Sequence, residues 1–110
     1  MSTKRAYLRC DLHGRGKLLD GSKKVVAEFE VLNISASGAS IGTDADLDEG
    51  GVFNAKMLFN GHITEMNLNV NARLVRKEAY NNKFVYGIEF VDITDRDRTE
   101  IDEIVCYSCI

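Results

Sequence analysis

The stretch EMNLNVNARL, from Glu65 to Leu74, carries the most regular pattern of hydrophobic residues in this chain of 110 residues. Its apolar positions are Met66, Leu68, Val70, Ala72 and Leu74, and they alternate with polar or charged residues. A period of two residues places all the apolar side chains on one face of an extended strand. The stretch therefore predicts an antiparallel strand with one buried face and one solvated face.

The segments on either side of this strand also have the character of strands. VFNAKMLF, at Val52–Phe59, precedes it and is followed by Asn60-Gly61, a strong hairpin signal. FVYGIEFVDI follows it after Asn81-Asn82, with Phe84, Tyr86, Ile88 and Phe90 expected on one face. We therefore expect three consecutive strands here, joined by tight turns.

The N-terminal part adds two more predicted strands, and the C-terminal part adds a helix. KVVAEFEVLNI, from Lys24, is rich in β-branched residues, and the turn signal Asp20–Ser22 separates it from a strand at about 9–19. TDRD, from Thr94, has the pattern of a helix N-cap, and apolar residues then recur at helical spacing. An acidic loop is expected over 43–51. Short strands with one terminal helix favour a small closed β-barrel over a parallel sheet.

Composition limits the possible partners of the protein. The formal net charge is −3, so we expect neither a nucleic acid polymer nor an acidic membrane as the main partner. The sequence contains no apolar run long enough to span a bilayer and no signal-peptide pattern, which predicts a cytoplasmic protein without membrane insertion. Cys10, Cys106 and Cys109 are expected to be reduced thiols, and the CYSC spacing lacks the further ligands that a metal site needs. We predict no metal site and no cofactor.

Two polar motifs are candidates for ligand binding. RAYLR carries Arg5 and Arg9, whose planar guanidinium groups suit phosphate oxygens or the edge of guanine. NISASG carries Asn33 and Ser35, which have hydrogen-bonding side chains, and Gly38, which permits close approach of another backbone. Taken singly, the first motif also fits a solvated basic arm, and the second also fits a turn between strands.

Together, in this order, the two motifs resemble the signature of the PilZ domain family. RLVRKE, YGIEFVDI and the capped C-terminal helix resemble later parts of that family, so the likeness covers nearly the whole chain. The resemblance implies an all-β fold, a six-stranded antiparallel β-barrel with a C-terminal α-helix. It also implies binding of the bacterial second messenger cyclic di-GMP, without catalytic activity.

The resemblance also implies a set of ligand-binding residues. Arg5 and Arg9 would bind guanine and phosphate, and Lys4 would add a phosphate contact. The barrel would supply the other half of the site, from Asn33, Ser35 and Gly38. Leu74 stands where some family members place an aromatic residue, so stacking on a base would come from Arg73 or Arg76, of which we expect Arg73. We expect one domain over 1–110, with a mobile N-terminal arm at 1–9, the barrel at 10–93 and the helix at 94–108.

Four functions compete on this basis. The leading hypothesis is a cyclic di-GMP receptor that orders its arm on binding and signals to a protein partner in motility, attachment or polysaccharide control. The alternative is a PilZ-like adaptor that binds protein and no nucleotide. A barrel that binds single-stranded nucleic acid lacks the basic, aromatic-rich face it would need. An enzyme is the weakest hypothesis, because no nucleophile is paired with a base.

Overall fold

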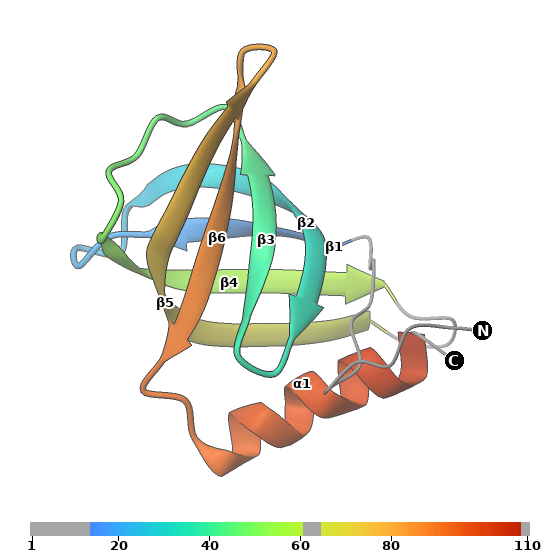
Figure 1. The fold of residues 1–110 in the computed structure, drawn as a ribbon. Helices are drawn as coiled ribbons and strands as arrows, with labels where there is room; N and C mark the ends of the chain where they lie inside the picture. The colour runs from blue at the N-terminus through green and yellow to red at the C-terminus, as the bar shows by residue number, and fades with distance from the viewer. Residues whose placement is uncertain (1–13, 61–64, 109–110) are drawn as a thin grey trace.

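The computed structural model describes residues 14–60 and 65–108, which form a closed antiparallel β-barrel followed by one helix (Figure 1). The elements are β1 (Gly14–Leu19), β2 (Val25–Ser35), β3 (Gly38–Thr43), β4 (Val52–Asn60), β5 (Glu65–Tyr80), β6 (Lys83–Val91) and α1 (Asp95–Ser108). Neighbouring strands follow the order β1-β2-β3-β6-β5-β4, and pairing of β1 with β4 closes the barrel. The predicted all-β fold, a six-stranded barrel with a C-terminal helix, is confirmed.

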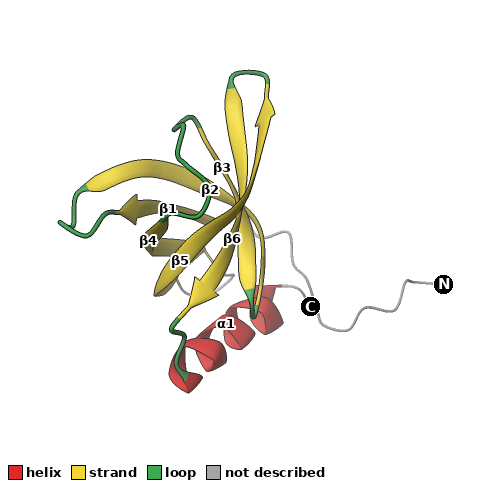
Figure 2. Cartoon of the chain, turned by 60° about the vertical axis from the view of Figure 1, so that its left-hand side comes forward, coloured by secondary structure: helices red, strands yellow, loops and turns green. Residues whose placement is uncertain are grey.

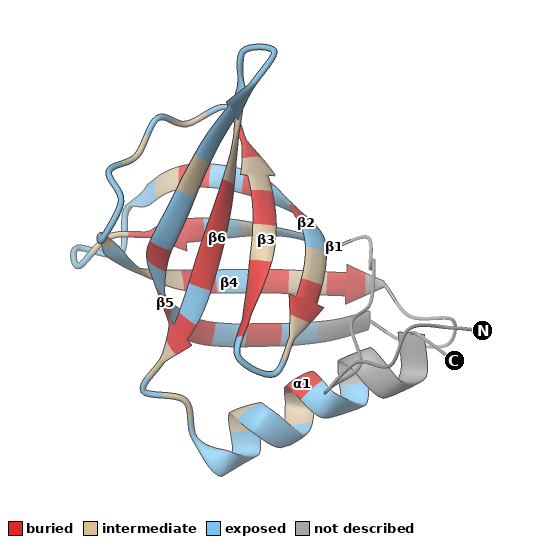
Figure 3. Ribbon diagram, viewed as in Figure 1, coloured by how far each residue is buried: buried red, intermediate tan, exposed pale blue. Residues whose placement is uncertain are grey.

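The core is the interior of the barrel, filled from every strand. On β5, Leu68, Val70, Ala72 and Leu74 are buried while the asparagines between them are exposed, as the alternation predicted. On β6 the side chains of Tyr86, Ile88 and Phe90 are buried, and Phe84 packs against the same cluster. Alternating buried and exposed bands along the strands are visible in Figure 3. The side chain of Met66 lies outside the described part.

Tight turns join β1 to β2 and β5 to β6. The Asp20 carboxylate accepts hydrogen bonds from the backbone N–H groups of Ser22 and Lys24, which closes the turn between β1 and β2. Asn81 and Asn82 have φ values of 44° and 71°, a left-handed conformation that asparagine tolerates better than most residues. Two predicted features lie outside the described residues: the hairpin turn at Gly61, after β4, and the part of the first strand at residues 9–13.

Helix α1 lies along one end of the barrel (Figures 1 and 2). The Asp97 N–H donates to Thr94 Oγ1 at 3.1 Å and the Thr94 N–H donates to Asp97 Oδ2 at 3.2 Å, which is a reciprocal capping pair. Ile101 is fully buried and joins the barrel core. Within residues 14–60 and 65–108, no helix is long and apolar enough to cross a membrane.

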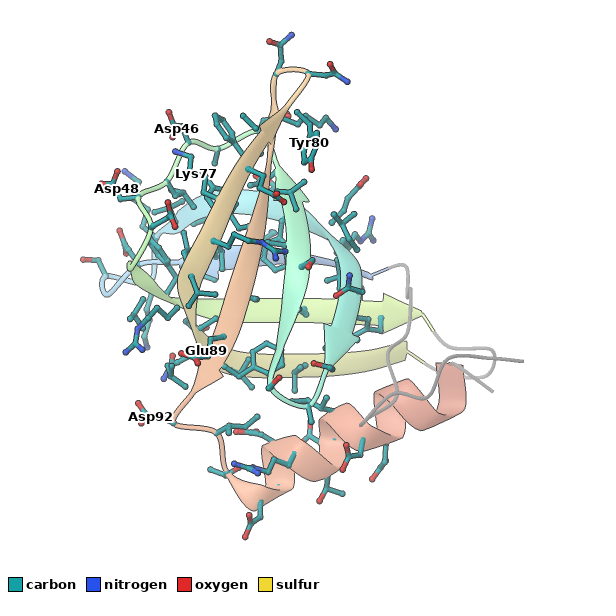
Figure 4. The ribbon with its side chains drawn as sticks, viewed as in Figure 1. Asp46, Asp48, Lys77, Tyr80, Glu89 and Asp92 are labelled. Atoms are coloured by element: carbon teal, nitrogen blue, oxygen red, sulfur yellow. The ribbon has the colours of Figure 1, made fainter. Side chains whose placement is uncertain are left out.

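The acidic loop between β3 and β4 is tied to β6 and β5 by two side chains. Tyr86 is fully buried, yet its hydroxyl donates to the Ala45 carbonyl at 2.7 Å and accepts from the Leu47 N–H at 2.7 Å. Lys77 binds Asp46, as Figure 4 shows, and this hydrogen bond raises the pKa of the Lys77 ammonium. The loop is therefore held against the upper part of the barrel.

Replacing Tyr86 by phenylalanine tests this attachment. Tyr86→Phe leaves the ring in the core but removes both hydroxyl hydrogen bonds, so we expect the free energy of unfolding in urea to fall by about 1–3 kcal/mol. Tyr80→Phe is the matched control, because Tyr80 is 55% exposed and its hydroxyl has no partner among the described residues. Equal stability of the two variants would contradict this role of Tyr86.

Candidate functional site

The NISASG motif lies where β2 turns into β3, and its polar residues are on the outer face of the barrel. Asn33 is paired with Ser40, and Ser35 with Gly38, across the β2–β3 ladder. Asn33 and Ser35 are half-buried, while Ile34 between them is fully buried in the core. The motif therefore spans two strands and presents its amide and hydroxyl groups outward.

A β-bulge at Leu32 is what turns Asn33 outward. Val31 faces the core, so regular alternation would return Asn33 to the core two residues later. The ladder instead skips Leu32: Val31 pairs with Ile41 and Asn33 with Ser40. The extra residue places both Leu32, which is 41% exposed, and Asn33 on the outer side.

Gly38 is required by the barrel itself. A Cβ atom at this position would lie 2.1 Å from the carbonyl oxygen of Ile88 on β6, which is a clash with backbone. The Ser35 hydroxyl donates to the Gly38 carbonyl over 3.4 Å, a long hydrogen bond. The close approach predicted for this glycine is therefore an approach to the neighbouring strand.

The outer face beside the motif has a floor of small residues. This small-residue floor consists of Gly38, Ser40 and Gly42 on β3 and Gly87 on β6. Near Gly42 the floor adjoins a cleft of about 650 Å³ that Leu32, Val85 and Tyr80 also line. Ser40 and Gly42 are half-buried and Gly38 and Gly87 are buried, and none of the four has a side chain larger than that of serine.

Two arginines of β5 border the floor on the side opposite Asn33. Arg73 Nη1 lies 3.4 Å from Glu89 Oε1, with both side chains about half exposed. Figure 4 labels Glu89 near the end of β6 that leads to α1. Arg76 is paired with Gly87 and lies over it, and its Nε is 3.9 Å from Glu78 Oε1. An exposed ion pair contributes little stability, so either arginine can exchange its carboxylate partner for a ligand.

The structure places part of the predicted site and leaves part untested. Asn33, Ser35, Gly38 and Arg73 share the outer face of β2, β3, β6 and β5. Lys4, Arg5 and Arg9 lie outside the described residues. The sequence reasoning did not single out Ser40 or Gly87. An isolated glycine within the strand pattern FVYGIEF was the available signal for Gly87.

A small closed barrel with a polar, glycine-floored outer face is the class of domain that this structure defines. The family model for the PilZ domain matches residues 3–106. The chain belongs to the PilZ domain family. No curated protein sequence matches the chain.

Solved structures share the fold at low sequence identity. YcgR from Escherichia coli in complex with c-di-GMP has a TM-score of 0.72 at 16% identity, covering 94% of this chain and 45% of that one. The Bacillus subtilis inhibitor of motility, MotI, has a TM-score of 0.73 at 15% identity, covering 96% of this chain and 50% of that one. The isolated PilZ domain of YcgR with c-di-GMP has a TM-score of 0.68 at 16% identity, covering 94% and 90%. The chain thus spans about half the length of YcgR and of MotI.

The structural role of Gly38 can be tested without ligand. Gly38→Ala should lower the free energy of unfolding by about 1–3 kcal/mol, because β3 and β6 must separate to admit the methyl group. Gly42→Ala is the control, since the nearest atoms to its added methyl would be Leu32 side-chain carbons at 3.8 Å and 3.9 Å. A Gly38→Ala protein as stable as the parent in urea would contradict this structural role.

Proposed function

We propose that this protein is a receptor for cyclic di-GMP. The observation that carries the proposal is the joint placement of Asn33 and Ser35 on the outer face, beside the small-residue floor. Membership of the PilZ family supports it, as do the c-di-GMP complexes of YcgR among the structures with this fold. The ligand would lie on the barrel surface, between this face and residues 1–9.

The residue types fit the chemistry of the ligand. The Asn33 amide can donate to and accept from a guanine edge, and the Ser35 hydroxyl can do the same for a base or a phosphate. Arg5 and Arg9 supply guanidinium forks for guanine and phosphate oxygens, and Lys4 supplies a further positive charge. Because the chain carries a formal net charge of −3, attraction for this dianion must come from such local groups.

Signalling would follow from the way the ligand joins two parts of the chain. We propose that residues 1–9 become ordered over the ligand, while residues 10–93 and 94–108 act as a barrel and a helix that keep their structure. The changed surface would then be presented to a protein partner. The name of the Bacillus subtilis inhibitor of motility supports a role of this kind in controlling movement.

Calorimetric titration tests ligand binding directly. We expect cyclic di-GMP to bind and GMP to bind far more weakly, because the two guanines of one ligand can engage both motifs at once. Asn33→Ala and Ser35→Ala should each lose about 1–3 kcal/mol of binding free energy, as loss of a ligand hydrogen bond does, with little change in thermal midpoint. Absence of binding by the parent protein would favour the adaptor that binds no nucleotide.

The arginine motif has its own test. Arg9→Ala should weaken binding about tenfold or more while changing the free energy of unfolding by less than about 0.5 kcal/mol. Hydrogen exchange over residues 3–10 should be fast without cyclic di-GMP and slow at saturation. Protection that is the same in both conditions would contradict closure of this segment over the ligand.

A further inference from the structure

Two β-bulges lie at the same level of the barrel, one on each side of the small-residue floor. The bulge in β2 precedes Asn33, which pairs with Ser40, and Ser40 pairs with Gly87 on β6. Gly87 in turn pairs with Arg76, directly after the second bulge, where Leu74 pairs with Ile88 and Val75 is skipped. Asn33, Ser40, Gly87 and Arg76 thus form one row across four strands, which we call the bulge row.

The second bulge does for Arg76 what the first does for Asn33. Leu74 is fully buried, so regular alternation would direct Arg76 into the core. The skipped Val75 is 50% exposed, and Arg76 is exposed beside it. Bulges are frequent next to functional sites because they change the direction of side chains. Here two bulges turn Asn33 and Arg76, the polar residues at the ends of the bulge row, to the outer face.

The Arg76 side chain lies over Gly87, which carries no side chain of its own. A Cβ added to Gly87 would lie 3.4 Å from Arg76 Cβ, 3.7 Å from its Nε and 3.8 Å from its Cζ. The arginine therefore leans over the glycine, toward the middle of the bulge row. Arg73 differs, because it points to Glu89 at the level of Ser35 and Gly38.

We propose that Arg76 is a base-binding residue whose guanidinium plane stacks on a guanine of cyclic di-GMP held over the bulge row. The inference rests on the proposed function and concerns the part of the site that neither motif supplies. Three strand spacings of roughly 4.8 Å separate the ends of the row, which leaves room for a purine between them. An arginine plane offers a purine both stacking and a cation–π attraction, and Asn33 offers the same base a hydrogen-bonding edge.

Substitutions at both ends of the contact separate stacking from charge. Arg76→Ala and Arg76→Lys should each raise the calorimetric Kd for cyclic di-GMP about tenfold, since lysine keeps the charge but has no plane to stack. Gly87→Ala should also raise the Kd, because its methyl group would stand in the row over which the guanine is held. The matched controls are Arg98→Lys, an exposed arginine of α1, and Gly21→Ala, in the turn between β1 and β2 where an added Cβ would have no atom within 4 Å, and both should bind as the parent does.

A spectroscopic measurement distinguishes stacking from a merely structural role. The circular dichroism induced in the guanine bands of bound ligand should weaken in Arg76→Lys, while the dependence of Kd on salt concentration should keep its slope. Thermal midpoints of the unliganded variants should match the parent. Parent-like binding by Arg76→Lys, or equal losses in Arg98→Lys, would overturn the role of Arg76 while leaving the receptor function standing. Failure of the parent protein to bind would overturn both.

Discussion

Every strand of a closed barrel presents its side chains alternately to the core and to solvent, and this constraint decides which polar groups of the protein reach its outer face. In β2 and β5 the constraint is relaxed by one residue each, at Leu32 and Val75. Without those residues Asn33 and Arg76 would face a core made of leucine, isoleucine and phenylalanine. The polar face and the apolar core thus depend on the same two irregularities of the ladder.

The elements of the fold could be predicted because their signals are local. Alternation from Leu68 to Leu74, the Asn81-Asn82 turn and the Thr94–Asp97 cap each occupy a few consecutive residues, and each is found in the structure. Contacts between distant residues gave no such signal. Tyr86 was expected to be buried, but its hydrogen bonds to Ala45 and Leu47 join residues about forty positions apart. The attachment of the acidic loop was therefore not predictable.

For the candidate site, the sequence indicated which residues face outward but not which neighbours they contact. The family resemblance implied that Asn33 and Ser35 lie on the barrel surface, and the alternation of β5 put Arg73 on its solvated face. The structure has all three on the outer face, while their contact with a ligand stays a prediction. The difference between Arg73 and Arg76 depends on Glu89 and Gly87, which belong to the neighbouring strand β6. Only the pairing register brings these residues together, and the skipped residue Val75, which shifts this register between Arg76 and Leu74, had no signal in the sequence.

The close packing of Gly38 against Ile88 bears on how sequence motifs of this kind should be read. A glycine that the barrel needs for its own backbone would be retained by a descendant that had lost its ligand. Its presence in an aligned sequence therefore reports ancestry and fold, and carries little information about activity. Asn33 and Ser35 differ from Gly38, because an alanine at either position would not clash with the backbone of a neighbouring strand, and comparisons between relatives should give these two positions the greater weight.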